Sequence, residues 1–392
     1  MLGVSQLLLM VCFCWQEVPI EVLQVQSAGP ERASWQGIDA DKVTIQVGGQ
    51  SRSIPLATLR SVKFAESTKQ IAQDAGNIVL LNDGTRILPM QVTGKGQDVV
   101  LELSSTHNLQ VSANHFRSVQ FQKLTEKQLP QWRAIQESRL TADTLVVIRS
   151  ADALDKIEGQ ILEINAERVV FEFNKQKIEA PRSKLAGLRF LTPPVQNQRI
   201  KAIVTDLWGN VYQVVQVVSQ SATSVEMALS CGAKISLPVA QLANIDFSVA
   251  SIKYVAEMTP LGNDRVSSFA AKVPGAGADQ LFAPQPVKLP QSNGPSLKML
   301  GSGSVTYRVP DEYTSVAGSV YLAPEGEQFT PCTVELRLEN EVIWQGKLKH
   351  PTDRLDFSVP VVADKRLQLN VQADSSYPVG DVVMWQELRM MK

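Results

Sequence analysis

The sequence predicts a mainly β protein in which tandem small antiparallel β-barrels precede a larger β-sandwich. Apolar and polar residues alternate with a period of two through much of the chain, as they do in half-buried strands. The six-residue ending "LRSVKF" at 59–64 returns as "FRSVQF" at 116–121, "LAGLRF" at 185–190 and "LANIDF" at 242–247. Because the rhythm stops there, we expect a domain of another kind after it.

Each of the four endings closes a segment that contains several short strand patterns separated by turn residues such as Asp83-Gly84. Five short strands are typical of a small antiparallel barrel, of the Sm-like or Src-homology-like kind, which closes its own edges. In the first ending, a tight turn would bring Leu59 beneath Val62, and Val62 and Phe64 would share one face of the last strand. The ending is therefore interpreted as the plug of a barrel core.

A short amphipathic helix is expected between the second and third barrels. The segment "LPQWRAIQESRL" has Pro130 at a plausible first helical position and places Trp132, Ile135 and Leu140 near helical spacing. This helix would separate a first pair of barrels from a second pair. The predicted domains are a signal peptide (1–28), two barrels (29–123), a helical connector (124–144), two barrels (145–248) and a sandwich (250–392).

The N-terminal residues predict export. The segment "MLGVSQLLLMVCFCW" is apolar, with no acid before Glu17 and no base before Arg32, and it is too short to span a bilayer as a helix. A signal peptide ending at Ala28 would make the protein extracytoplasmic, either secreted or in the cell envelope. Two alternatives stay open, a wrongly assigned start codon and a buried first strand. Lipidation at Cys12 is disfavoured because bulky Val11 precedes it.

Composition excludes some partner classes. The chain has 392 residues, 44% hydrophobic and 20% charged, which is typical of two or three globular domains. Its net charge is −1, and no run of Lys or Arg forms a basic patch, so nucleic acid is not an expected partner. Cys231 and Cys332 are far apart in the sequence and predict neither a disulfide framework nor a thiolate metal site. No cofactor is expected.

The C-terminal part changes in pattern from about residue 250. A Gly- and Pro-rich stretch is followed by alternating runs that predict an antiparallel β-sandwich. The runs "YVAEMTPLG", "VTYRVPDEYTSVAGSVYL", "CTVELRLENEVIWQGKL" and "GDVVMWQELRM" resemble the NPCBM family of carbohydrate-binding modules, whose fold is a galactose-binding-like sandwich. The most specific element of the resemblance consists of Gly380, Asp381, Trp385 and Leu388. The third repeat is also similar to the small β-barrel segment that often precedes such modules.

The resemblance implies a sugar site in residues 250–392. Aromatic rings stack on the apolar faces of sugars, while amides and carboxylates bind hydroxyl groups. The candidate binding residues are Tyr377, Asp381, Trp385, Trp344 and Tyr313, and Tyr307 and Tyr321 are further aromatic residues of this part. For Trp344 and Trp385, which lie in strand patterns, burial in the core is the alternative interpretation. For Asp381 the alternative is a turn that satisfies backbone amides.

The sequence predicts no enzyme. Its three histidines are scattered, and it contains no HExxH, GxSxG or P-loop motif, so no catalytic and no metal-binding residue is named. The first hypothesis is an exported, non-catalytic carbohydrate-binding protein that uses the barrels as a spacer or adaptor. Its partner would be a polysaccharide or glycoconjugate. The alternative is a structural or assembly protein of the cell envelope that contacts envelope proteins and binds no glycan. An enzyme accessory subunit is a third possibility.

Overall fold

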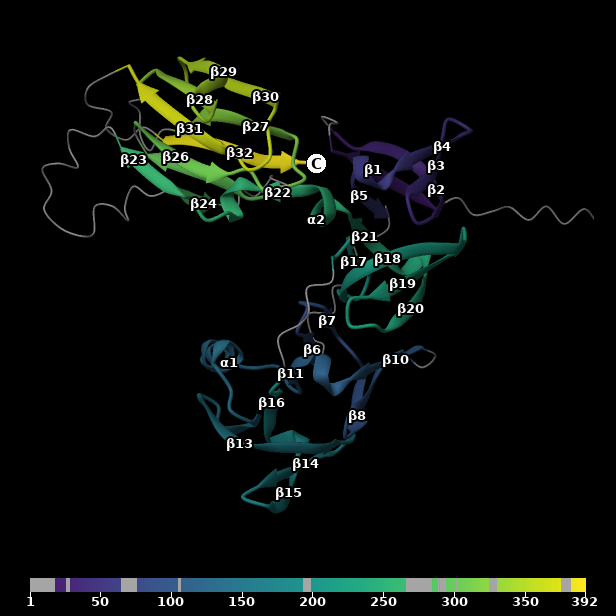
Figure 1. Ribbon diagram of the computed structural model, residues 1–392. Helices are drawn as coiled ribbons and strands as arrows, with labels where there is room; N and C mark the ends of the chain where they lie inside the picture. The colour runs from purple at the N-terminus through teal and green to yellow at the C-terminus, as the bar shows by residue number, and fades with distance from the viewer. Residues whose placement is uncertain are drawn as a thin grey trace, which may run out of the picture. The chain divides into compact units, whose positions relative to one another are not determined.

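The chain forms two compact units, residues 1–250 (unit 1) and 251–392 (unit 2) (Figure 1). The structure is a computed structural model that describes residues 18–25, 29–64, 76–104, 107–192, 199–265, 284–287, 289, 294–300, 302–323, 330–374 and 382–392. The described residues are mainly in antiparallel strands, as the sequence predicts. No helix in these ranges is long and apolar enough to cross a membrane.

Unit 1 contains four repeats of one plan. In the first repeat the strands are β1 (Pro19–Gln24), β2 (Glu31–Ile38), β3 (Lys42–Val47), β4 (Gln50–Pro55) and β5 (Leu59–Phe64), and the 3₁₀ turn η1 (Leu56–Thr58) precedes β5. Successive strands from β1 to β4 pair as hairpins, and β5 pairs with β1. The resulting strand order is β4-β3-β2-β1-β5. The Sm-like or Src-homology-like assignment stays a prediction.

The other three repeats follow the same order. In the second repeat the second strand is divided into two short pieces, β7 and β8. Repeat two contains β6 (Ile78–Leu81), β7 (Arg86–Ile87), β8 (Gln91–Lys95), β9 (Asp98–Ser104), β10 (His107–Ser112), η2 (Ala113–His115) and β11 (Phe116–Gln120). Repeat three contains β12 (Asp143–Ser150), β13 (Ala153–Ile164), β14 (Arg168–Phe173), β15 (Gln176–Pro181), η3 (Arg182–Lys184) and β16 (Leu185–Arg189). Repeat four contains β17 (Ala202–Asp206), β18 (Val211–Ser221), β19 (Ser224–Leu229), β20 (Lys234–Pro238), η4 (Val239–Gln241) and β21 (Leu242–Asp246).

The repeated ending is the plug of each repeat. Its central aliphatic residues, Val62, Val119, Leu188 and Ile245, are each 0% exposed. The final phenylalanines, at positions 64, 121, 190 and 247, are also buried. A 3₁₀ turn precedes the closing strand in all four repeats. The predicted burial of the endings is therefore confirmed, whereas the tight turn that we expect between Leu59 and Val62 lies instead before Leu59.

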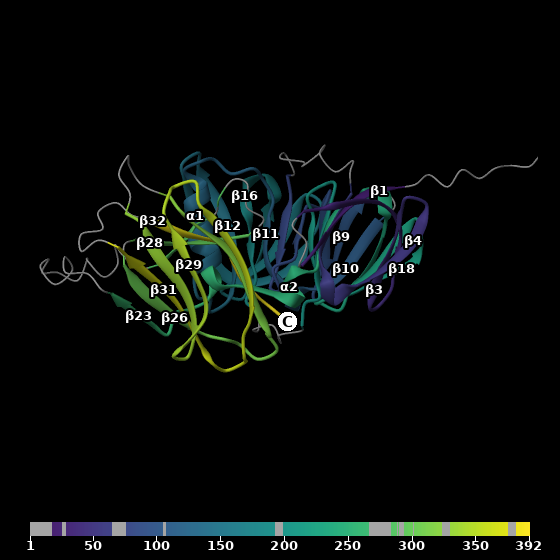
Figure 2. The same cartoon turned by 90° about the horizontal axis from the view of Figure 1, so that it is seen from above.

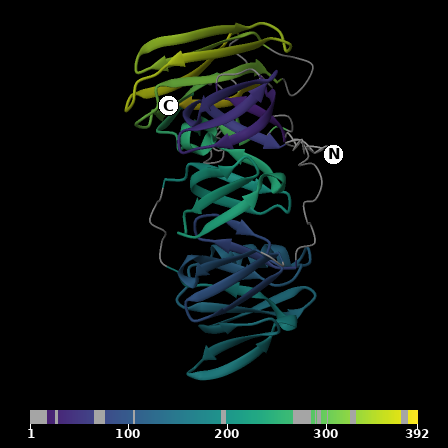
Figure 3. The same ribbon diagram turned by 90° about the vertical axis from the view of Figure 1, so that its right-hand side faces the viewer.

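The closing strands also join repeats that are not neighbours in the sequence. β5 pairs with β21, so repeat one adjoins repeat four, and β11 pairs with β16, so repeat two adjoins repeat three (Figure 3). In the first junction Val62 lies opposite Ile245, the residue at the same position of the ending, and in the second Val119 lies opposite Leu188. Each junction thus has an approximate two-fold axis. The sequence predicts pairs of consecutive barrels, one with two and three with four, whereas the closing strands join repeat one to four and repeat two to three.

Repeats two and four meet through their first turns, again with approximate two-fold symmetry. Arg86 of β7 pairs with Val211 of β18. The Asn210 side-chain oxygen accepts a hydrogen bond from the Leu88 N–H at 2.6 Å, and the Thr85 hydroxyl accepts one from the Gln213 N–H at 3.0 Å. Two corresponding polar side chains thereby accept hydrogen bonds from the backbone of the other repeat.

A buried carboxylate organises the repeat-four side of this junction. Asp206 is 2% exposed and accepts hydrogen bonds from the Asn210 amide at 2.6 Å and the Tyr212 hydroxyl at 3.1 Å. The backbone N–H groups of Trp208 and Asn210 also donate to it. Burial raises the pKa of Asp206 above its ordinary value, against the effect of these hydrogen bonds. All of these donors belong to the same turn and the strand that follows it, so we infer that Asp206 stabilises the turn.

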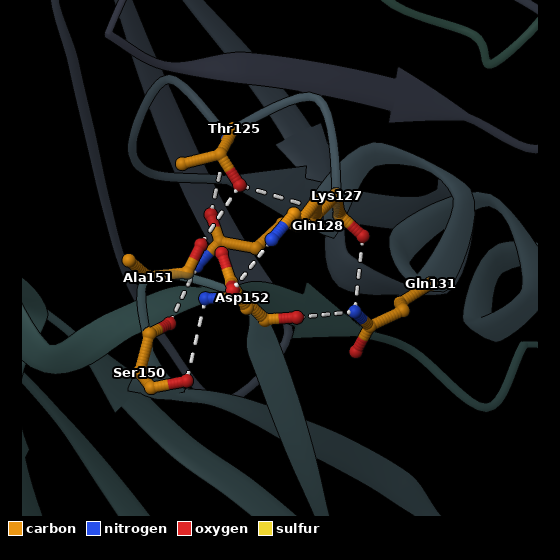
Figure 4. A network of polar contacts seen from close by, with 7 residues as sticks. All are labelled: Thr125, Lys127, Gln128, Gln131, Ser150, Ala151 and Asp152. Atoms are coloured by element: carbon orange, nitrogen blue, oxygen red, sulfur yellow. Dashed lines mark hydrogen bonds and ion pairs between the residues drawn. The ribbon is translucent and has the colours of Figure 1, made fainter.

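The expected helix is α1 (Gln128–Glu137), and it packs on repeat three. Trp132 is 3% exposed and joins a small cluster with Leu124, Val146 and Ala186. Polar contacts fix the helix to the β12–β13 turn (Figure 4). The Gln128 amide donates to the Ser150 carbonyl at 2.9 Å, and the Gln131 amide donates to the Asp152 carbonyl at 2.7 Å. The helix is thus part of the third repeat's packing.

Unit 2 is a sandwich of two antiparallel sheets (Figure 2). One sheet has the order β24 (Gln285–Val287), β25 (Ser296–Leu300), β32 (Val382–Met391), β27 (Ser315–Leu322) and β30 (Arg354–Pro360), with β22 (Ile252–Tyr254) paired to β32. The other has the order β23 (Gly262–Arg265), β26 (Gly303–Arg308), β31 (Arg366–Ala373), β28 (Cys332–Leu338) and β29 (Glu341–Leu348). The short elements α2 (Ser248–Ser251) and η5 (Val255–Glu257) flank β22. Inward side chains of both sheets form one core, as expected of a sandwich.

Candidate functional site

Two of the predicted binding residues, Trp385 and Trp344, pack within the sandwich of unit 2. Trp385 on β32 is 0% exposed and Trp344 on β29 is half-buried. Their rings are linked through Phe357 of β30, with ring centroids 4.7 Å apart for Trp344 and Phe357 and 6.0 Å apart for Phe357 and Trp385. This aromatic row lies inside the sandwich where the edge strands β29 and β30 meet. Core packing, the alternative interpretation, is therefore the role of Trp385, and Trp344 closes that edge.

Of the other three predicted residues, the structure describes only Tyr313. Tyr313 packs partly buried against the core of unit 2, and the Lys392 ammonium lies 5.8 Å from the centre of its ring. Tyr377 and Asp381 lie outside the described residues. Among the described residues of the most specific NPCBM-like element, Trp385 and Leu388 both face the core.

A half-buried aromatic residue, Tyr321, lies on the outer face of the sheet that contains β27. Along this strand Val320 and Leu322 are buried in the core, whereas Ser319 and Tyr321 alternate with them and point outward. In the ladder, Tyr321 lies opposite Arg354 of β30, and Ser319 lies opposite Asp356 of β30 and Gln386 of β32. The outer face therefore has a row of polar side chains beside the ring of Tyr321.

A β-bulge on β32 aims Gln386 onto this face. The register between β27 and β32 shifts between Ala317 and Ser319, and Glu387 has a φ of 49°. The extra residue lets Trp385 and Leu388 both point into the core while Gln386 points out. Gly318 lies opposite the bulge, where an added Cβ would be 3.1 Å from the Leu388 Cα, so the close approach favours glycine.

These residues line a hollow of about 520 Å³, which we call the Tyr321 hollow. Its volume lies within the roughly 300–1,000 Å³ of small-molecule sites. It is lined by Leu289, Tyr321, Pro351, Thr352, Asp353, Arg354 and Gln386. One Arg354 nitrogen donates to the Ser319 hydroxyl at 2.9 Å, which holds the guanidinium group across the outer face of β27.

The turn between β29 and β30 forms one end of the hollow and is fixed by Asp353. One carboxylate oxygen accepts hydrogen bonds from the N–H groups of Lys349 at 2.7 Å and His350 at 2.9 Å. These bonds lower the pKa of Asp353, so the carboxylate stays ionised at neutral pH. Asp353 therefore stabilises the turn that presents Pro351 and Thr352.

The arrangement offers an aromatic ring, apolar flanks from Leu289 and Pro351, a guanidinium group and an amide. Such a set can bind a ligand that has both apolar patches and hydroxyl groups. Within the described ranges no three His, Cys, Asp or Glu side chains are grouped so that they could hold a metal ion. Sequence reasoning named Tyr321 only among the aromatic residues and missed Arg354 and Gln386. Strand alternation predicts that Tyr321 and Arg354 point outward, but the orientation of Gln386 depends on the bulge.

Comparisons with known proteins show carbohydrate-binding modules among similar structures. No family model and no curated protein matches the sequence. A CBM51 module from Clostridium perfringens GH95, solved with methyl-galactose, is 13% identical, with a TM-score of 0.28, and the match covers 36% of this chain and 99% of that one. The CBM51-2 and INT domains of C. perfringens ZmpB, solved with GlcNAc, are 9% identical, with a TM-score of 0.29, and the match covers 57% of this chain and 43% of that one. Tandem CBM51 modules of Streptococcus pneumoniae Sp3GH98 are 11% identical, with a TM-score of 0.28, and the match covers 77% of this chain and 97% of that one.

Proposed function

We propose that the protein is an exported, non-catalytic carbohydrate-binding protein and that unit 2 binds glycan at the Tyr321 hollow. The observation that carries the proposal is the half-buried ring of Tyr321, which lines the hollow beside the polar side chains of Arg354 and Gln386. A sugar ring would stack its C–H face on the tyrosine, and its hydroxyl groups would accept from the guanidinium group and exchange hydrogen bonds with the amide. The resemblance of residues 250–392 to the NPCBM family supports the same ligand class.

Export and the absence of catalysis belong to this proposal. The apolar N-terminal segment supports a signal peptide, with the protein then secreted or held in the cell envelope. Asp353, the carboxylate of the hollow, is engaged by backbone amides and so is better suited to fix a turn than to transfer a proton. The four repeats of unit 1 would act as a spacer or adaptor for the binding unit.

The alternative, an envelope assembly protein, is supported by a specific observation in unit 1. The junctions of the closing strands and of the first turns of repeats two and four have approximate two-fold symmetry, which resembles that of homodimer interfaces. A protein built from such contacts has surfaces suited to further protein partners. In that case the Tyr321 hollow would bind no glycan.

A glycan array probed with the full chain tests the proposal. We expect binding to a defined set of glycans and at least a tenfold loss of affinity in Tyr321→Ala, because the stacking surface is removed. Val342→Ala is the matched control, since Val342 is an exposed apolar residue of the same unit on the other sheet, 42% exposed. Thermal unfolding verifies that both variants fold. Absence of binding to every glycan, or equal binding by Tyr321→Ala, would contradict the proposal.

A further inference from the structure

We infer that repeat three binds a second copy of this chain through the free edge of β15, in an antiparallel pairing centred on Ile178. The interface lies in unit 1, so the inference does not depend on glycan binding by unit 2. Within the described residues the strand ladders join β15 to β14 alone, and β15 forms an outer edge of repeat three (Figure 1). A free strand edge offers backbone N–H and C=O groups to another strand.

This edge presents an apolar residue that the corresponding edges do not. Ile178 lies four residues before the 3₁₀ turn of its repeat and is 39% exposed. Leu109 of β10 and Ile235 of β20 occupy the same position in repeats two and four, and they are 2% and 7% exposed. In repeat one the position is Arg52, a charged residue that disfavours pairing of edges. Phe173 of β14, on the same face of the hairpin as Ile178, is also exposed.

The backbone of β15 directs alternate groups toward the free side. The Arg182 N–H donates to the Glu167 carbonyl at 2.8 Å, which continues the register of the β14–β15 ladder. Because every second residue of an antiparallel strand bonds to the same neighbour, Ile178 also bonds to β14. Lys177 and Glu179 therefore direct their N–H and C=O groups away from β14. These are the groups that a strand of a second copy would pair with.

Charge selects the register of the pairing. With Ile178 opposite Ile178 of the second copy, Lys177 of each copy lies opposite Glu179 of the other. Opposite charges directly across a ladder stabilise the pair, whereas like charges destabilise it. A pairing centred on Lys177 or on Glu179 would place two like charges opposite each other. Glu179 also accepts a hydrogen bond from Arg168 at 2.8 Å, and the two oxygens of a carboxylate can bind both cations.

The second copy would cover the apolar residue of the edge. The two Ile178 side chains would contact each other across the two-fold axis, in a pair whose Cα atoms lie about 4.5 Å apart. Burial of this apolar surface favours the pairing. Two short strands cover far less than the roughly 1,600 Å² of a standard interface, so we expect a weak and reversible dimer.

Sedimentation velocity of the full chain at concentrations from about 1 µM to about 1 mM tests the inference. We expect a reversible equilibrium of monomer and dimer. Lys177→Glu places glutamates opposite each other in both charge pairs, and Glu179→Lys places lysines there. Each variant alone should therefore dimerise about tenfold more weakly than the original protein. When the two variants are mixed, every pair has opposite charges again, so a mixed dimer should form about as tightly as the original one.

Lys234→Glu is the matched control for these charge changes. Lys234 occupies on β20 the position that Lys177 has on β15, but the apolar residue beside it, Ile235, is buried. The control should leave the dimer unchanged, and thermal unfolding verifies that each variant folds. A chain that stays monomeric over the whole range, or charge variants that do not associate when mixed, would overturn the inference.

A cysteine cross-link tests the register. Ile178→Cys should form a disulfide-linked dimer under oxidising conditions, beyond any formed by the original protein, because the two Cα atoms would lie about 4.5 Å apart. Gln176→Cys should not, since Gln176 would lie opposite Ala180 of the second copy. Non-reducing electrophoresis measures both. Equal cross-linking of the two variants would overturn the pairing centred on Ile178.

Discussion

Gly187 provides a direct test of how repeats two and three are joined. It lies on the closing strand β16, between Gln120 of β11 and Val146 of β12. A Cβ added at this position would overlap the carbonyl oxygen of Val119 and lie 2.7 Å from the ring of Trp132. The carbonyl belongs to a strand ladder and the ring to the packed α1, so neither can move without breaking other contacts.

We expect Gly187→Ala to destabilise unit 1 by about 2 to 3 kcal/mol, the usual cost of forcing an extra carbon into a packed site. For a unit of this size the change corresponds to a fall in melting temperature of roughly 5 to 10 °C. Differential scanning calorimetry of the full chain measures it. Glycine is required here because the Val119 carbonyl of β11 and the Trp132 ring of α1 both lie against this position. The same position of the ending is Ser61, Ser118 or Asn244 in the other repeats.

Gly76→Ala is the matched control, because its Cβ would meet only the Phe121 carbonyl oxygen, at 3.9 Å, which is ordinary contact. It should melt within about 1 °C of the original protein. If Gly187→Ala melted at the same temperature as this control, the close packing of β11, β16 and α1 would be wrong. The junction described between repeats two and three would then have to be abandoned.

Three further outcomes are expected. Asp206→Ala should destabilise unit 1 by about 3 kcal/mol in chemical denaturation, because it leaves the buried donors of Asn210 and Tyr212 without their acceptor. The pKa of Asp206 is raised in the folded state, so ionisation of this group costs stability. The original protein should therefore gain stability relative to Asp206→Asn as pH falls from neutral toward the ordinary Asp pKa of about 4, and an unchanged difference over this whole range would argue against this. Glu387→Val should weaken both the stability of unit 2 and its glycan affinity, because a β-branched residue disfavours the φ of 49°. Glu387→Gly should preserve both properties, because glycine adopts this φ readily. Equal behaviour of the two variants would refute the role of the bulge.

The cores of the repeats could be predicted from the sequence, because a period of two and a recurring apolar ending directly reflect burial. The partners of the closing strands could not. All four endings have nearly the same pattern, so Val62 matches Val119 as well as it matches Ile245. The pairing of these strands is decided by tertiary contacts between residues that are far apart in the sequence, such as the contact of Asn210 with Leu88.

The orientations of the candidate-site residues could also be predicted only in part from the sequence. The strand patterns around Trp344 and Trp385 indicated burial, and both residues do pack in the sandwich. The outward face could be read for Tyr321 from simple alternation. Gln386 follows buried Trp385 and comes two residues before buried Leu388, and only the register shift opposite Gly318 explains how it faces out. Because a slip of one residue exchanges the two faces of a strand, a bulge must be known before a site across strands can be predicted.

The nested pairing of the repeats has a consequence for how unit 1 forms. Leu188 follows Val119 by 69 positions, whereas Ile245 follows Val62 by 183, so closing the outer junction from an unfolded chain costs about 0.9 kcal/mol more in loop entropy. Once repeats two and three have paired, most of the intervening chain is already compact. The contact of Arg86 with Val211 then holds repeat four beside repeat two. The outer junction between repeats one and four is therefore favoured after the inner one, and the turn junction at Asp206 links the two.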